Sequence, residues 1–229
     1  MTLLESIDLF PMILTLLAFQ IGRMAQEKWK KPIFNPTLIG MILVVAVLLA
    51  TGMNPAGYTA GMVRLSWLMT PATICLAIPM YEQFRVLRRN LKAILAGVIA
   101  GSAACMGTIL ALGLLLEFDQ ELIVSLLPKS VTTAIGVSLS ELFGGMAGVT
   151  TAVIIVTGIG GNMLGPVLCK LFKIEDPVAQ GVAFGTAAHV IGTAKANELS
   201  QLTGAASSLS LVVAGLLTAV LMPILTNVM

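Results

Sequence analysis

The sequence is dominated by apolar runs that are long enough to cross a lipid bilayer as helices. A helix needs about 20 mostly apolar residues to span roughly 30 Å of hydrocarbon. Of the 229 residues, 57% are hydrophobic and only 10% are charged, whereas about a quarter are charged in a soluble domain. The runs lie at about 9–22, 36–52, 63–80, 91–116, 148–171 and 205–228. We therefore predict an all-α polytopic membrane protein with about six transmembrane helices.

The flank of the first apolar run argues against a cleaved signal peptide. Glu5 and Asp8 precede this run, and no basic residue does. A signal peptide begins instead with a positively charged region. We therefore expect the first span to remain in the mature protein.

Basic residues collect in three connections between the predicted spans, and they indicate the orientation of the chain. Lysine and arginine are enriched in the cytoplasmic loops of membrane proteins. Ten of the 13 basic residues lie in these connections, namely Arg23, Lys28, Lys30, Lys31, Arg85, Arg88, Arg89, Lys92, Lys170 and Lys173. The connection EFDQE at 117–121 is acidic throughout. We therefore expect the three basic connections in the cytoplasm and both termini outside.

Two segments fall outside the predicted spans, at 120–145 and 177–204, and both contain residues that disrupt helices. Pro128 in the first segment removes a backbone donor, and it is followed by Lys129, Ser130, Thr132 and Thr133. The second segment contains Gly181, Gly185 and Gly192 together with Thr186, His189 and Thr193. Broken helices are tolerated at membrane depth only where they face protein or a water-filled cavity.

Each of these segments could cross the membrane fully or form a re-entrant hairpin. Asp119 and Glu141 are 22 residues apart, which is roughly 33 Å of continuous helix, so length permits a crossing. Composition favours the hairpin. A cytoplasmic position of Lys170 and Lys173 also requires the first segment to return to the outer face. We therefore expect two broken or re-entrant segments, with full crossings as the alternative.

A shift of 57 residues aligns one part of the chain with another. The matched positions are Asp119 with Asp176, Glu141 with Glu198, and GSAACMGT at 101–108 with GIGGNMLG at 158–165. Residues 91–145 and 148–204 therefore look like duplicated units, and re-entrant segments would make them an inverted repeat of the kind found in secondary transporters. Alternatively, two spans rich in small residues align by composition alone. We divide the chain into scaffold helices at 1–90 and a transport core at 91–229 that ends in a helix at 205–228.

The broken segments predict a binding site for a small anion near the membrane midplane. If the chain breaks at Pro128, a half-helix begins near Ser130, and its free N–H groups and positive dipole end face the break. Two such ends that meet at the midplane fit a carboxylate. The substrate-binding candidates are Lys129, Ser130, Thr132, Thr133, Thr186, His189, Thr193 and Lys195, with Pro128, Gly185 and Gly192 as helix breaks.

The candidate residues also have simpler interpretations. Lys129 and Lys195 could snorkel or pair with an acid, although charge inside a membrane is costly and usually functional. The single histidine could be a packing residue or a proton relay. The threonines could bond to their own helices, and Asn162 could join two helices. The candidates for proton coupling are His189, Glu82, Glu141 and Glu198, of which the last two could be ordinary interfacial charges.

No other chemistry is indicated by the sequence. It contains no phosphate loop, nucleophile–base pair or metal-ligand spacing. Cys75, Cys105 and Cys169 lie inside apolar runs and are odd in number, so we expect neither disulfides nor a metal cluster. We therefore predict no enzymatic activity, no cofactor, no metal and no nucleic-acid partner.

Three stretches resemble, in order and spacing, the hallmark stretches of the LrgB/CidB family. They are PMYEQ at 79–83, LPKSVTTAIG at 127–136 and GTAAHVIGTAKANEL at 185–199. The resemblance covers nearly the whole chain. The positions that it marks are Tyr81, Glu82, Gln83, 128–133, Gly185, Thr186, His189, Gly192 and Thr193. The chain departs from the family pattern at Ala134, where proline is common, and at Lys195, where arginine is common.

The resemblance implies two functions. The family is associated with antiholin-like or holin-like control of murein hydrolases and autolysis, and with transport of small carboxylates such as pyruvate, glycolate or glycerate. It usually works beside a small LrgA/CidA-type membrane partner. We expect a homo-oligomeric transporter of small organic anions in the bacterial inner membrane, with an antiholin-like or holin-like regulator as the alternative.

Overall fold

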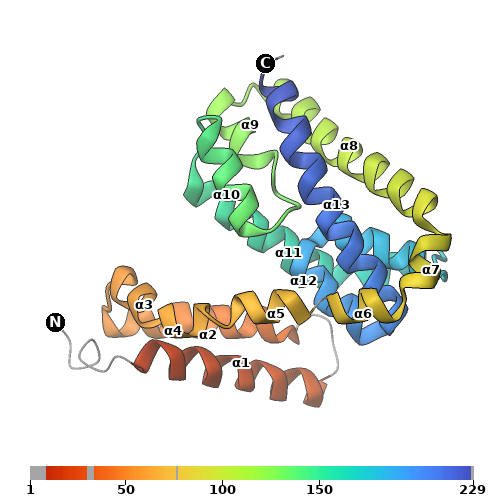
Figure 1. The fold of residues 1–229 in the computed structure, drawn as a ribbon. Helices are drawn as coiled ribbons and strands as arrows, with labels where there is room; N and C mark the ends of the chain where they lie inside the picture. The colour runs from red at the N-terminus through yellow and green to blue at the C-terminus, as the bar shows by residue number, and fades with distance from the viewer. Residues whose placement is uncertain (1–8, 30–33, 76, 228–229) are drawn as a thin grey trace. The chain divides into compact units, whose positions relative to one another are not determined.

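The computed structural model describes residues 9–29, 34–75 and 77–227, and the regular structure within these ranges is helical (Figure 1). Glu5, Asp8, Lys30 and Lys31, on which the predicted orientation partly rests, lie outside the described residues. The chain forms two compact units, Met1–Cys75 and Leu76–Met229. The division at 75–76 differs from the one drawn from the sequence at 90–91, because helix α6 (Ala77–Glu82) packs against helix α13 (Gln201–Thr226).

The described residues of the N-terminal unit form two longer helices and three short ones. They are α1 (Phe10–Trp29), α2 (Pro36–Thr51), α3 (Pro55–Gly61), α4 (Val63–Ser66) and α5 (Met69–Cys75). Helices α1 and α2 approach closely at Gly22, where an added Cβ would lie 2.7 Å from the Pro36 carbonyl oxygen. The Asn35 side chain accepts hydrogen bonds from Thr37 N and Leu38 N at the start of α2, as N-cap residues do.

The stretch 63–80 was predicted to be one span, but within its described residues the helix is interrupted at Trp67 and Leu68, between α4 and α5. Proline lacks the N–H that bonds to the carbonyl four residues earlier, so Pro71 leaves the carbonyl of Trp67 without its helical donor. Helix α4 accordingly ends at Ser66.

The C-terminal unit contains the three described helices that are long and apolar enough to cross a membrane: α8 (Leu91–Leu115), α11 (Ala147–Leu171) and α13. They correspond to the predicted spans 91–116, 148–171 and 205–228. Helix α13 begins earlier than predicted, because Ser200 caps it by accepting a bond from Thr203 N at 3.0 Å. In the N-terminal unit, α2 is apolar but shorter.

Helices α8 and α11 have the same length and end in the same way. Each has 25 residues. Glu117 and Lys173, just beyond them, have positive φ values of 53° and 54°. In each case the N–H of the next residue bonds back into the helix, from Phe118 to the Gly113 carbonyl at 2.8 Å and from Ile174 to the Cys169 carbonyl at 2.8 Å. Both ends therefore form a left-handed C-terminal cap.

The elements after these helices also recur at a constant spacing. Helix α9 (Gln120–Leu126) follows Asp119, and α12 (Pro177–Leu199) follows Asp176. Helix α10 (Thr133–Leu142) ends 57 positions before α12 does. The order of long helix, short helix, break and short helix thus occurs twice.

The chain reverses its direction at both breaks. Between α9 and α10, residues 127–132 leave the helical path, and Thr150 Oγ1 of α11 lies 2.9 Å from the Ser125 carbonyl and 2.7 Å from Ser140 Oγ. In α12, Ala188 and His189 have non-helical backbone angles. Phe184 and Ala196 share one buried cluster, although a continuous helix would separate them by about 18 Å.

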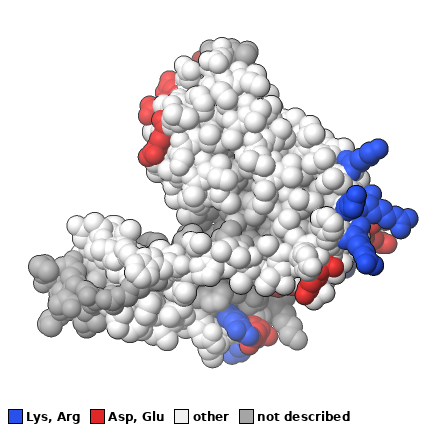
Figure 2. Space-filling model, viewed as in Figure 1, with Lys and Arg blue, Asp and Glu red and all other residues white. Residues whose placement is uncertain are grey.

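Charged side chains of the C-terminal unit gather at its two ends (Figure 2). Basic side chains lie over α7 (Phe84–Arg89) and the start of α8, and acidic side chains lie over the end that holds α9 and α10. Helix α8 runs between these two ends (Figure 1).

Candidate functional site

A cavity of about 530 Å³ lies between α8, the break at 127–132 and the first half of α12. Its walls are mostly small or apolar. Lys129, Ser130 and Thr186, three of the predicted substrate-binding residues, lie on its wall. The α8 residues on the wall are Gly97, Gly101, Ala104, Cys105, Thr108, Ile109 and Leu112. A second cavity of only about 10 Å³ adjoins it and shares Cys105, Ser130 and Thr186.

The break at 127–132 follows from Pro128 and from the cap of the next helix. Lys129 N bonds to the Leu126 carbonyl at 3.1 Å and Val131 N to the Pro128 carbonyl at 3.3 Å, so the segment is folded into tight turns. Thr132 then caps α10 by accepting a bond from Ile135 N at 3.5 Å. The predicted half-helix is present and begins at Thr133, three residues later than expected from the sequence.

The break lies beside the middle of a membrane-length helix. Ser130 Oγ is 3.3 Å from Cys105 Sγ, and Cys105 is close to the midpoint of α8. A site beside this point is about as far from both membrane surfaces as the helix allows. Non-helical backbone is tolerated there only against protein or water, and the cavity meets that condition.

Lys129 brings a positive charge to the cavity wall. It is half-buried, and Ser130 Oγ lies 3.5 Å from its Nζ atom. No carboxylate of the described residues pairs with it. An ammonium group has three donors, so Lys129 retains donor capacity for an anion in the cavity.

Thr186 brings an unused hydroxyl group. Its side chain is 6% exposed, and its Oγ1 atom has no hydrogen-bond partner among the described residues. A buried polar group left without a partner costs about 1–3 kcal/mol. The Oγ1 atom is itself covered, so a ligand or water in the cavity would remove this cost once the side chain rotates toward it. Gly101 makes room for the residue, since an added Cβ there would lie 3.0 Å from Thr186 Cγ2.

The second break holds His189 and Thr193 in the packed interior, and neither residue lines the described cavities. His189 is 3% exposed with φ of 42°, a value that strains a non-glycine residue. Its Nε2 atom lies 2.9 Å from the Ile154 carbonyl, so Nε2–H donates. Thr193 Oγ1 donates to the His189 carbonyl at 2.9 Å and lies 2.8 Å from Ser207 Oγ.

Gly185 and Gly192, which were expected to break the second segment, do not form the break themselves. The non-helical residues are Ala188 and His189, between Gly185 and Gly192. An added Cβ at Gly192 would lie 2.7 Å from the Phe184 carbonyl. Gly185 lies directly against the Ser207 carbonyl of α13. Both glycines therefore allow close packing around the reversal.

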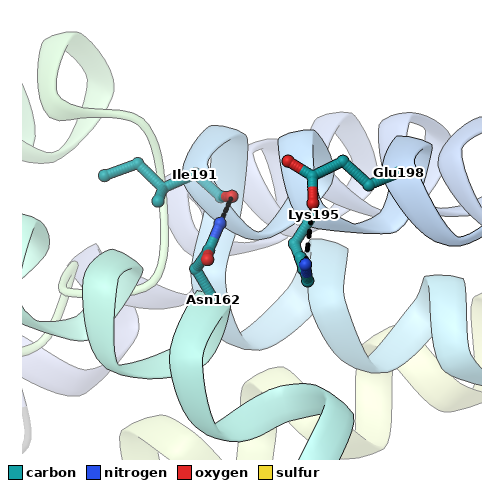
Figure 3. Close-up of polar contacts among 4 residues, drawn as sticks. All are labelled: Asn162, Ile191, Lys195 and Glu198. Carbon is teal, nitrogen blue, oxygen red and sulfur yellow. Dashed lines mark hydrogen bonds and ion pairs between the residues drawn. The ribbon is translucent and has the colours of Figure 1, made fainter. Parts of the chain in front are cut away.

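The remaining candidates lie away from the cavity wall. Lys195 forms an ion pair of 2.7 Å with Glu198, and its side chain is 23% exposed (Figure 3). Asn162 Nδ2 donates to the Ile191 carbonyl at 3.0 Å, which joins α11 to α12 just beyond the break (Figure 3). Thr133, Glu82 and Glu141 are exposed.

Sequence reasoning missed the contribution of α8. Cys105, Gly97 and Gly101 were not among the residues that the sequence predicted to bind a substrate. Both glycines and Cys105 line the cavity. The available signal was the row of small residues at 97, 101, 104, 105 and 108, which share one helix face.

Comparisons with known proteins give matches that cover almost the whole chain. The model of the LrgB-like family matches residues 15–228. A holin-like protein CidB of Staphylococcus epidermidis is 32% identical over 213 residues, covering 93% of each chain. An antiholin-like protein LrgB of Bacillus subtilis is 32% identical over 216 residues, covering 94% of each. The uncharacterized protein YwbG of Bacillus subtilis is 33% identical over 223 residues, covering 97% of this chain and 99% of its own. No solved structure matches.

Proposed function

The chain belongs to the LrgB-like family, and we propose that it is a membrane carrier of small organic anions. Its substrates are monocarboxylates such as pyruvate, glycolate or glycerate. The observation that carries this proposal is the cavity beside the middle of α8, because Lys129, Ser130 and Thr186 converge on its wall.

The residues on the wall suit one small carboxylate. Lys129 supplies the charge, and a hydrogen bond to a charged group contributes about 1.5–3 kcal/mol. Ser130 and Thr186 supply neutral donors, of which the Thr186 hydroxyl has no protein partner in the described residues. The positive end of α10, capped by Thr132, begins just after this segment and favours an anion.

The arrangement of the two repeated segments, 91–145 and 148–204, supports alternating access. We propose that 91–145 and 148–204 form an inverted-topology repeat with two re-entrant segments. The support is the doubled order of elements, the chain reversal at each break and the opposite charge at the two ends of the C-terminal unit (Figure 2). Such repeats place substrate sites at the midplane between broken helices.

Uptake into proteoliposomes tests the function directly. Labelled pyruvate, lactate, glycolate and glycerate are offered to the purified chain with and without a pH gradient. We expect saturable uptake of at least one acid, and competition among the acids that fit. The absence of uptake of all four under either condition would contradict the carrier proposal.

A holin-like or antiholin-like regulator of murein hydrolases and autolysis is the second candidate, and the names of two relatives favour it. The Lys129→Ala variant separates the two candidates. A carrier loses uptake, and any effect on autolysis that depends on transport is lost with it. A regulator that acts through assembly keeps its effect on autolysis in this variant.

We propose further that the protein is a homo-oligomer of the bacterial inner membrane, assisted by an LrgA/CidA-type subunit and with both termini outside. Cysteine labelling tests the orientation. Cysteines placed in 24–31, 85–92 or 172–175 should react only from the cytoplasmic side, and those in 54–60 or 117–121 only from outside. Labelling of 172–175 from outside would contradict the inverted repeat.

A further inference from the structure

A separate groove of about 470 Å³ lies where α6 and α7 meet the start of α8 and the side of α13. Its size is within the range of about 300–1,000 Å³ that is usual for small-molecule sites. The wall is apolar over most of its area, from Met80, Tyr81, Phe84, Leu87 and Leu209, and Arg88 also lines it.

The chain segment that contributes most of this groove is strongly basic. The segment 77–92 carries Arg85, Arg88, Arg89 and Lys92 against one acid, Glu82. None of the four basic side chains pairs with a carboxylate within the part of the chain that the structure describes. Figure 2 shows basic side chains gathered over this end of the C-terminal unit. The groove therefore joins an apolar wall to unneutralised positive charge.

The groove also lies at the depth of lipid headgroups if α8 spans the membrane. Arg88 comes three residues before Leu91, the first residue of the 25-residue helix α8. Tyr81, an amphipathic ring that favours the membrane interface, lies on the same wall. Basic pockets between membrane helices on the cytoplasmic side bind anionic headgroups.

We propose that this groove binds one anionic phospholipid, with an acyl chain along the apolar wall and the phosphate on Arg88. The planar guanidinium matches phosphate in a two-point contact. A zwitterionic lipid has the same chains but a neutral headgroup, so Arg88 and its basic neighbours in the segment 85–92 favour an anionic lipid. This site is distinct from the cavity at Lys129, and the proposal does not depend on transport.

Native mass spectrometry of the purified full chain measures the binding. The probes are phosphatidylglycerol and phosphatidylcholine with identical acyl chains. We expect phosphatidylglycerol to bind more tightly, and Arg88→Gln to weaken it about fivefold, the factor that one basic side chain contributes near an anionic surface. Arg23→Gln is the matched control, because Arg23 is already paired with Glu27 at 3.0 Å. It should leave both affinities unchanged.

A second measurement asks whether lipid reaches the groove. In a background with Cys75, Cys105 and Cys169 replaced by alanine, Met80→Cys should react with a maleimide dissolved in the bilayer, and added phosphatidylglycerol should slow the reaction. Equal retention of the two lipids by the unaltered chain, or unchanged affinity in Arg88→Gln, would overturn the proposal. Complete protection of Met80→Cys in a phosphatidylcholine bilayer without phosphatidylglycerol would also overturn it, because another protein segment would then cover the groove.

Discussion

The breaks at 127–132 and at Ala188–His189 each follow a 25-residue helix and a shorter helical segment, but their surroundings differ. The first break spans six non-helical residues, and Lys129 and Ser130 face a cavity of about 530 Å³. The second spans two residues that are 1% and 3% exposed. Helix α11 fills the space around it, with Gly158 against the His189 ring. One break is thus open to a ligand and the other is sealed.

The difference shows that the long helix packed against a break determines whether that break is open to a ligand. The shift of 57 residues relates position 129 to position 186, and both residues line the same cavity. Helix α8 leaves space beside these residues, whereas α11 is joined to α12 by Asn162 and by packed glycines. If the protein is a carrier, we expect the segments 91–145 and 148–204 to exchange these arrangements. In this second conformational state, a cavity would open along α11.

Removal of the positive charge from the open break should have the largest effect on substrate affinity. Lys129→Ala should lower substrate affinity by about 1.5–3 kcal/mol, or roughly ten- to a hundredfold, without loss of membrane insertion. Isothermal titration or competition of uptake measures this change. Lys195→Ala is the matched control. Its ion pair with Glu198 is partly exposed, and such pairs contribute about 0–1 kcal/mol. Unchanged affinity in Lys129→Ala would mean that this lysine only snorkels.

A methyl group added at the sealed break should destabilise the fold more than one added at the open break. A Cβ at Gly158 would lie 2.6 Å from His189 Nε2, whereas at the equivalent Gly101 the nearest atom, Thr186 Cγ2, is 3.0 Å away. Overpacking costs about 1–3 kcal/mol, so Gly158→Ala should lower the melting temperature in detergent more than Gly101→Ala.

Gly160→Ala serves as the control on the same helix. No atom lies within 4 Å of an added Cβ at Gly160, and alanine favours helix over glycine by up to about 1 kcal/mol. The control should therefore match or exceed the stability of the original chain. Equal losses at Gly158 and Gly160 would show that the break is not sealed by packing.

Replacement of His189 should separate its possible role as a proton relay from its role in packing. Glutamine keeps a side-chain donor for the Ile154 carbonyl but cannot titrate near neutral pH. We expect His189→Gln to retain most of the substrate affinity and to flatten the dependence of uptake on pH. Uptake rates measured at several pH values check this expectation. A pH profile like that of the original chain would assign His189 to packing alone.

The positions of the long helices and of the first break were predictable from the sequence. Three apolar runs became α8, α11 and α13, and Pro128 marked the interruption because proline removes a helical donor. The stretch 63–80 is interrupted at Trp67 and Leu68, and its apolar composition did not reveal this interruption. Proline alone does not mark such interruptions either, because Pro166 and Pro223 lie inside the continuous helices α11 and α13.

The composition of the site was only partly predictable. Lys129, Ser130 and Thr186 were expected to face a ligand, and they lie on one cavity wall. Thr193 and His189 looked equally suitable by residue type, yet α11 and α13 provide their hydrogen-bond partners. Whether a polar residue faces a cavity depends on the helix packed against it, and this neighbour can be far away in the sequence.

We predict the smallest effect for Thr186→Val, which should raise the melting temperature but lower the substrate affinity. Thr186→Val keeps the shape of the side chain and removes a buried hydroxyl that has no partner among the described residues. Because such a group is costly to bury, we expect the variant without substrate to melt at a higher temperature. If the hydroxyl donates to the bound acid, affinity should fall by about 0.5–1.5 kcal/mol, which is roughly two- to tenfold. Thr193→Val should instead lower the melting temperature, because it removes a hydroxyl bonded to Ser207 Oγ at 2.8 Å. Higher stability with unchanged affinity would remove Thr186 from the binding site and leave the carboxylate to Lys129 and Ser130.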